Sequence, residues 1–93
     1  MKNFIKVFTL SSKQMVSFRC EFDHGLLDYR IEASTYVRAT FYRTCSVYDT
    51  YEEMKNDFEF RMNHDNAENF YRFAFSEVES LEDEQMGLGD IMN

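Results

Sequence analysis

The sequence predicts an α+β domain in which an antiparallel β-meander of about four strands is covered on one face by two C-terminal helices. Residues 1–48 contain runs in which apolar and polar side chains alternate, as they do in strands. Residues 49–86 change to helical spacing after a capping signal. The length of 93 residues suits a single domain with a small core and is too short for a second one.

The four strands are expected over residues 4–10, 16–22, 27–33 and 36–45. Apolar and polar side chains alternate without an error in the second and third segments. Asp23-His24-Gly25 lies between them, and its glycine can adopt the positive φ of a tight turn, so these two segments should form a β-hairpin. The fourth segment is rich in β-branched and aromatic residues. Short polar turns favour an antiparallel order throughout.

The first helix is expected to begin at a capping box formed by Thr50 and Glu53, in which each side chain satisfies a free backbone N–H group. Its apolar stripe is Tyr51, Met54, Phe58 and Met62. The segment 58–62 also alternates, which would fit a strand, and the capping box favours the helix.

The second helix is expected to begin at a similar cap over residues 65–68 and to end before Gly87. Its apolar stripe is Ala67, Phe70, Tyr71, Ala74, Phe75, Val78 and Leu81. Residues 87–93 are then a frayed tail. The whole chain is one domain, with strands mainly in residues 1–48 and helices mainly in residues 49–86.

Charge is divided unevenly between the two halves. The formal charge of −7 comes from ten Lys/Arg and seventeen Asp/Glu. Residues 1–48 hold seven cations and four carboxylates, which gives +3, whereas residues 49–93 hold three and thirteen, which gives −10. The average field repels nucleic acid and anionic membranes, so direct binding to either is not expected. The outer face of the sheet is expected to be mildly basic, with Arg19, Arg30 and Arg38.

His24 and His64 are the first candidates for a catalytic or metal site, because each lies beside an aspartate. Neither has a third ligand at a recognisable spacing, so both are interpreted as turn or cap residues, and a small enzyme is the least favoured hypothesis. Cys20 and Cys45 form no C-x-x-C pair and are expected to be small buried side chains in a reducing cytoplasm. We therefore predict no catalytic residues, no cofactor and no metal.

The carboxylates of the helical half form a candidate partner-binding set. They are Asp49, Glu52, Glu53, Asp57, Glu59, Glu68, Glu77, Glu79, Glu82, Asp83 and Glu84. Acids in a first helical turn are favoured by the helix dipole, whereas Glu82-Asp83-Glu84 lies near a predicted C-terminus, where negative charge is disfavoured. Two adjacent helices can present carboxylates at a density similar to that of DNA phosphates, which are about 3.4 Å apart along each strand.

In its size, its acidity and its lack of a catalytic motif, the chain resembles the small acidic inhibitors that phages make against restriction enzymes and CRISPR effectors. Many of these inhibitors are DNA mimics. The resemblance implies a non-enzymatic, anti-restriction or anti-CRISPR protein that blocks a nucleic-acid-binding protein in the cytoplasm of a host cell.

Aromatic side chains outside the predicted core support an alternative. The candidate aromatic interface is Tyr36, Tyr42, Phe60 and Phe73. The two tyrosines are expected to share the outer sheet face with Arg38 and Thr40, and exposed aromatics beside arginine are typical of protein interfaces. The alternative function is a small structural or adaptor module, and this surface also suits a two-fold homodimer.

Overall fold

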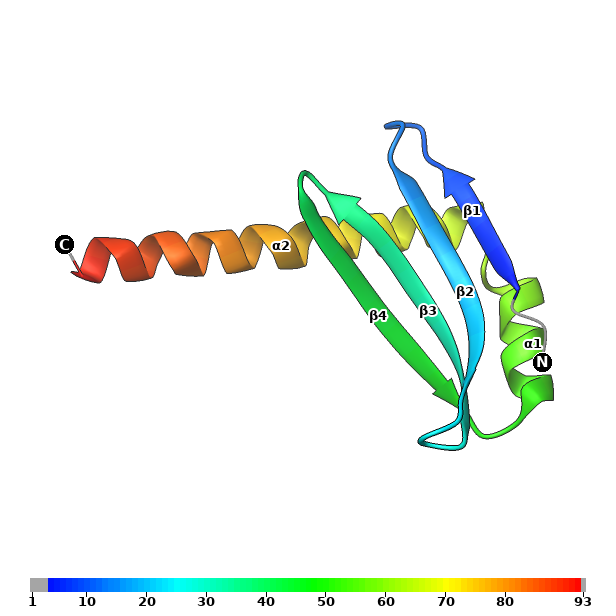
Figure 1. Cartoon of the computed structure of the whole chain (residues 1–93). Coiled ribbons are helices and arrows are strands. Elements are labelled where there is room, and N and C mark those ends of the chain that lie inside the picture. Colours follow the sequence, from blue (N-terminus) through cyan, green and yellow to red (C-terminus); the bar gives the residue numbers. More distant parts are fainter. Residues whose placement is uncertain (1–3, 93) are drawn as a thin grey trace.

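The computed structural model describes the backbone of residues 4–92 and the side chains of residues 4–82. It confirms the α+β class, with a four-stranded antiparallel sheet followed by two helices (Figure 1). The elements are β1 (Ile5–Thr9), β2 (Met15–Asp23), β3 (Asp28–Val37), β4 (Thr40–Tyr48), α1 (Tyr51–Phe60) and α2 (His64–Met92). Over these described residues, neither helix is both long enough and apolar enough to cross a membrane.

The strands lie side by side in chain order, so β1 and β4 are the two edges of the sheet. The predicted hairpin is present as β2 and β3, with Cys20 opposite Ile31. Both helices lie on one face of the sheet, and α2 crosses behind the strands from the β1 side and continues beyond β4 (Figure 1). We call the opposite face of the sheet, which neither helix covers, the open face.

The main core lies between the sheet and the helices. Alternate side chains of β2 and β3 point toward the helices, and Val16 and Cys20 are fully buried there in one core cluster with Met54 of α1. A smaller cluster of Val37, Ala74 and Val78 lies farther along α2. The sheet therefore holds α2 at two places before the helix extends past β4.

The predicted fourth strand is present, but its predicted bounds of residues 36–45 are wrong, because this segment contains the β3–β4 turn at Arg38-Ala39 and β4 covers Thr40–Tyr48. Val37 and Thr40 are paired across that turn. The φ angle of Arg38 is 56°, in the left-handed region that two-residue hairpins use and that arginine seldom occupies. No Gly, Asn or Asp marks the turn, so its position could not be recognised from turn chemistry.

The predicted geometry of the β2–β3 turn is also wrong in one respect. The positive φ angle, 56°, belongs to Leu27 and not to Gly25. Leu27 is 75% exposed and lies outside β3, so it does not contribute to the apolar face of the sheet. The turn is instead held by Asp23, whose carboxylate accepts the N–H groups of Gly25 and Leu26, each at 2.9 Å.

The predicted start of α1 is confirmed, because Thr50 Oγ1 accepts the N–H of Glu53 at 3.2 Å. The helix continues through Phe60, so residues 58–60 are helical and not a strand. The cap expected over residues 65–68 is wrong by two positions, since Asn63 Oδ1 accepts the N–H of Asn66 at 2.9 Å and α2 begins at His64.

The end of α2 differs from the prediction as well. The helix continues through Gly87 and Gly89 to Met92, where the sequence analysis expects a frayed tail. A glycine inside a helix costs about 1 kcal/mol relative to alanine, which weakens a helix without ending it. No proline follows to stop the helix.

Candidate functional site

Six large apolar side chains are exposed on the open face. The register places Ile5 and Val7 of β1, Met15 of β2, Tyr36 of β3, and Phe41 and Val47 of β4 on this face. Each is at least half exposed, from 50% for Phe41 to 60% for Ile5. The solvent face of an antiparallel sheet normally carries polar side chains. Exposed apolar groups gathered in this way are typical of protein-binding surfaces.

A hollow of about 440 Å³ lies on the same face. Its lining consists of Ile5, Ser17, Arg19, Glu32, Ser34, Phe41 and Arg43. Ser17 and Ser34 are directly opposite each other on the two central strands, so small side chains occupy the middle of the sheet. Ile5 and Phe41 line the hollow from the two edge strands. This arrangement can receive a side chain that protrudes from a partner.

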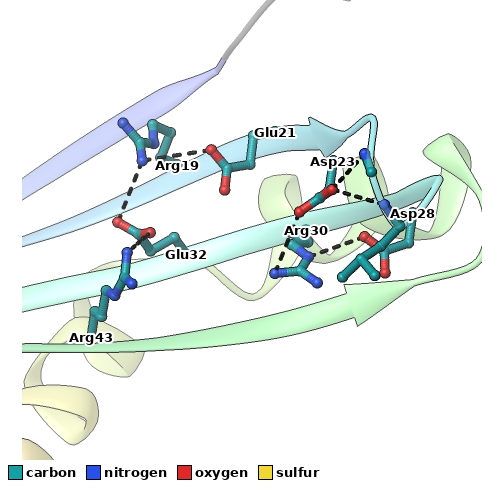
Figure 2. Close-up of polar contacts among 9 residues, drawn as sticks. Arg19, Glu21, Asp23, Asp28, Arg30, Glu32 and Arg43 are labelled. Carbon is teal, nitrogen blue, oxygen red and sulfur yellow. Dashed lines mark hydrogen bonds and ion pairs between the residues drawn. The ribbon is translucent and has the colours of Figure 1, made fainter.

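The prediction of a basic outer face is wrong, because carboxylates neutralise its arginines (Figure 2). Glu32 is only 8% exposed, and its carboxylate lies 3.4 Å from Arg43 Nη1 and 3.6 Å from Arg19 Nη2. Arg19 also lies 3.6 Å from Glu21. These side chains come from β2, β3 and β4, so one ionic network crosses the face, and Arg19, Glu32 and Arg43 line part of the hollow.

A second charged group lies near the β2–β3 turn. Arg30 Nε donates to Asp28 Oδ1 at 3.0 Å, and Arg30 Nη1 lies 3.8 Å from Asp23 (Figure 2). The hydrogen bonds from the N–H groups of Leu26 and Gly25, with Arg30 nearby, hold the pKa of the Asp23 carboxyl below its ordinary value of 3.8. Arg30 is therefore part of the local turn structure and not a free cation.

Arg38, in the β3–β4 turn, contacts the helical layer and not the open face. Its Nη1 donates to Glu82 at 2.5 Å, and its Nη2 lies 3.7 Å from Glu79. The guanidinium also lies over the ring of Phe75, 5.3 Å from the ring centre. These contacts connect the turn to α2 and neutralise part of the predicted acidic set.

Two more predicted acidic residues are engaged within the fold. Asp57 accepts the hydroxyl of Tyr48 at 2.7 Å, and burial together with this bond raises the pKa of Tyr48 to about 12. Glu68 accepts both the N–H and the hydroxyl of Ser11 at 3.3 Å. Both carboxylates therefore connect a helix to the sheet or to its turns.

The remaining acidic candidates are exposed or lie outside the described side chains. Those that are exposed and form no ion pair among the described residues are Asp49, Glu52, Glu53, Glu59 and Glu77. Asp83 and Glu84 are among the residues whose side chains the structure does not describe. The acids of the helical half are thus divided between internal contacts and a scattered exposed set on α1, on α2 and just before α1.

The four aromatic candidates do not form one surface. Tyr36 lies on the open face, with its ring centre 5.1 Å from that of Phe41. Tyr42 is half-buried on the helical side, 6.3 Å from Phe73 of α2. Phe60, at the end of α1, is 74% exposed. The predicted common face for the two tyrosines is wrong, because the two-residue β3–β4 turn reverses the alternation between them.

The histidines lie apart from any metal-binding arrangement that the structure describes. His24 packs against Phe22 with ring centres 4.9 Å apart, and His64 packs against Phe8 at 6.2 Å. Among the described residues, no three His, Cys, Asp or Glu side chains gather into a group that could hold a metal ion. Packing against aromatic rings accounts for the positions of both imidazoles.

The two cysteines have different environments. Cys20 is buried as predicted, and burial raises the pKa of its thiol to about 11. Cys45 is exposed, so the prediction that it is buried is wrong. It lies on the open face of β4, opposite Glu32, where no element covers it.

Sequence reasoning missed the apolar part of the open face. Ile5 and Val7 alternate with Lys6, which indicates that they share a face, but the pattern favours the core for these two apolar side chains and solvent for the lysine, and the structure shows the reverse. Phe41 carried no such signal, because its orientation depends on a turn that lacks typical turn residues. The hollow between the serines depends on strand register and could not be predicted without the paired strands.

Comparison of the chain with protein-family models, with curated proteins and with solved structures finds no match. The evidence on function is therefore the surface of the molecule itself. Two regions stand out on it, namely the open face with its hollow and the exposed acids of the helical layer.

Proposed function

We propose that the chain is a non-enzymatic protein-binding module whose docking surface is the open face of the sheet. The hollow over Ser17 and Ser34, bordered by Ile5 and Phe41, is the observation that most supports this proposal. The partner presents an apolar or aromatic side chain that enters the hollow. Such a module acts as an adaptor, or as an inhibitor when the partner surface it covers is itself functional.

The energetics of the open face favour such a contact. Fully burying a side chain such as Phe or Met contributes about 1.5–3 kcal/mol, so residues that are already half-buried contribute roughly half of that each. Arg19 and Arg43 keep Glu32 as a partner, so covering the network leaves no unpaired charge. Guanidinium groups also stack on aromatic rings, which suits an aromatic side chain in the hollow.

A second candidate is the one suggested by charge, in which the acidic helical surface binds the basic groove of a nucleic-acid-binding protein and mimics DNA. The observation that favours it is α2, which carries eight Asp/Glu and one Arg and extends beyond the sheet (Figure 1). Internal pairing of Glu79 and Glu82 with Arg38 weakens this candidate relative to the first.

Affinity capture from a lysate of the cells that express the chain tests both candidates in one experiment. The bait is the wild type, F41E on the open face, or F60E on α1. The last two are matched, since both replace an exposed phenylalanine by glutamate on opposite sides of the molecule. We expect the captured protein to be lost with F41E and retained with F60E and at high salt.

A fourth bait, E52Q/E53Q/E59Q/E77Q, addresses the acidic surface. Loss of the partner with this bait, or on raising the salt, together with retention by F41E, would contradict the open-face proposal and support DNA mimicry. Retention of the same partner by all variants would contradict both candidates. Circular dichroism of each bait checks that it is folded.

A further inference from the structure

The edge strand β4 has an unpaired outer edge, and most of its side chains are exposed on both faces of the sheet. Seven of its nine residues are exposed, whereas the central strands β2 and β3 carry most of the core. Its outer edge pairs with no strand among the described residues. Natural edge strands are usually protected by lysine, proline, bulges or short length. β4 has no proline or lysine, and Arg43 is its only charged residue.

The helix α2 is uncovered on the same side of the molecule. It passes under β4 close to Tyr42 and then continues past that edge (Figure 1). The ring centre of Tyr42 lies 5.9 Å from that of Phe70 and 6.3 Å from that of Phe73. Phe73 is 53% exposed and Leu81 is 54% exposed. Thr44 and Ser46 of β4 alternate with open-face residues and so point to the helical side, yet both are exposed, because α2 covers only the Tyr42 end of the strand.

We propose that a second copy of this chain supplies both missing contacts. A two-fold axis perpendicular to the sheet pairs β4 antiparallel with β4 of the other copy, which gives a continuous sheet of eight strands. The two helical layers then lie on the same side. Antiparallel pairing places the Thr40 end of one β4 beside the Tyr48 end of the other, so each projecting α2 passes under the uncovered Thr44 and Ser46 of its partner.

The hydrogen-bonding pattern of β4 is consistent with this pairing. Val37 and Thr40 flank a two-residue turn, where antiparallel strands form a hydrogen-bonded pair, and such pairs alternate along the ladder. Arg43 and Cys45 therefore direct their N–H groups away from β3. Pairing centred on Thr44, the middle of the strand, places Arg43 opposite Cys45 of the other copy and avoids an Arg43–Arg43 contact.

The edge strand and the projecting helix both contribute contact area. A nine-residue strand is about 30 Å long and a single sheet layer is about 10 Å thick, so edge pairing alone covers roughly 300 Å² of each copy. The projecting part of α2 adds to this on both copies, which brings the contact toward the about 800 Å² per partner of a standard interface. The helical side of β4 carries only Thr, Ser and Tyr, so the acidic α2 of the partner meets no carboxylate there.

Light scattering coupled to size-exclusion chromatography measures the mass in solution. We expect the wild type to have twice the 11.2 kDa of one chain, and L81E to have the mass of one chain. L27E is the matched control, because Leu27 is equally apolar, is exposed and lies in the β2–β3 turn, and it should remain dimeric. I5E should remain dimeric too, because Ile5 lines the hollow from β1, the opposite edge strand, and this separates the dimer proposal from the open-face function.

Oxidative cross-linking tests the strand pairing directly. In a C45S background, T44C places two cysteines directly opposite each other across the two-fold axis, within disulfide range. T9C on the other edge strand is the control. We expect a cross-linked dimer with T44C and none with T9C. A single-chain mass for the wild type, or equal cross-linking of both variants, would overturn the proposal.

Discussion

Lys6 shows how one side chain in β1 stabilises the end of α1. Its Nζ donates to the carbonyl oxygens of Phe58 at 2.6 Å and of Met62 at 3.2 Å, and it lies 4.7 Å from the centre of the Phe58 ring. A cation at a helix C-terminus interacts favourably with free carbonyl groups and with the helix dipole. In the sequence this lysine interrupts an apolar segment, and its partners are more than fifty residues away.

Replacing Lys6 by methionine should therefore lower the free energy of unfolding by about 1–3 kcal/mol, since it removes charge-assisted hydrogen bonds from partly buried carbonyl groups. Urea denaturation measures this change. K55M is the control, because Lys55 is exposed on α1 and forms no hydrogen bond or ion pair among the described residues. Equal effects of the two substitutions would contradict the capping role.

Asp23 should make the stability of the β2–β3 turn depend on pH. Because the folded-state pKa of this carboxyl is lowered, its contribution is fully present above 3.8 and is lost as the pH falls through the folded-state value. D23N keeps an oxygen acceptor but cannot ionise. We expect D23N to be less stable than the wild type at neutral pH, and the difference to vanish in acid. An unchanged difference across that range would contradict this account.

The two thiols should differ in reactivity. With a pKa of about 11 and no exposure, Cys20 should not react with a thiol reagent at mildly alkaline pH, whereas Cys45 is exposed and should react. We expect one labelled cysteine per native chain and two in denaturant, measured by intact mass. C45S should show no labelling in the native state, and labelling of Cys20 there would contradict its burial in the core.

At the scale of elements, the start of α2 provides a test of helix capping. Asn63 accepts the N–H of Asn66, so N63A should lower the free energy of unfolding by about 1 kcal/mol. D65A, the matched change at the position that the sequence suggests as the cap, should cost less because Asp65 accepts no backbone N–H among the described contacts. Thermal unfolding of both variants measures the difference, and a larger loss with D65A would contradict the observed cap.

The elements that could be predicted are those whose sequence signals act between residues close together in the chain. The alternation around Cys20 and Ile31 determines the β2–β3 hairpin, and the hydroxyl of Thr50 determines the start of α1, because both act over a few residues. The β3–β4 turn could not be predicted, since Arg38 adopts a left-handed φ where no Gly, Asn or Asp marks the turn. The residues that contact its guanidinium, Glu79, Glu82 and Phe75, belong to α2 and are distant in the sequence. That single missed turn reversed the orientation of the following strand and hid the open face.

At the scale of the whole molecule, the separation of charge should affect stability. The formal charge of −7 arises from the helical half, and the exposed acids without a cation partner repel one another. Salt screens such exposed charges, so we expect the free energy of unfolding to rise as sodium chloride is added. Urea denaturation at low and high salt measures this dependence.

Two variants identify which charges are responsible for the salt dependence. E52Q/E53Q/E59Q/E77Q removes four exposed acids and should be more stable than the wild type at low salt, with a smaller response to added salt. R19Q/E32Q leaves the net charge unchanged and removes one member of each sign from the open-face network, so it should retain the wild-type response. If salt instead destabilises the wild type, attraction within ion pairs outweighs repulsion. That result would contradict the expected repulsion among the exposed acids of the helical half.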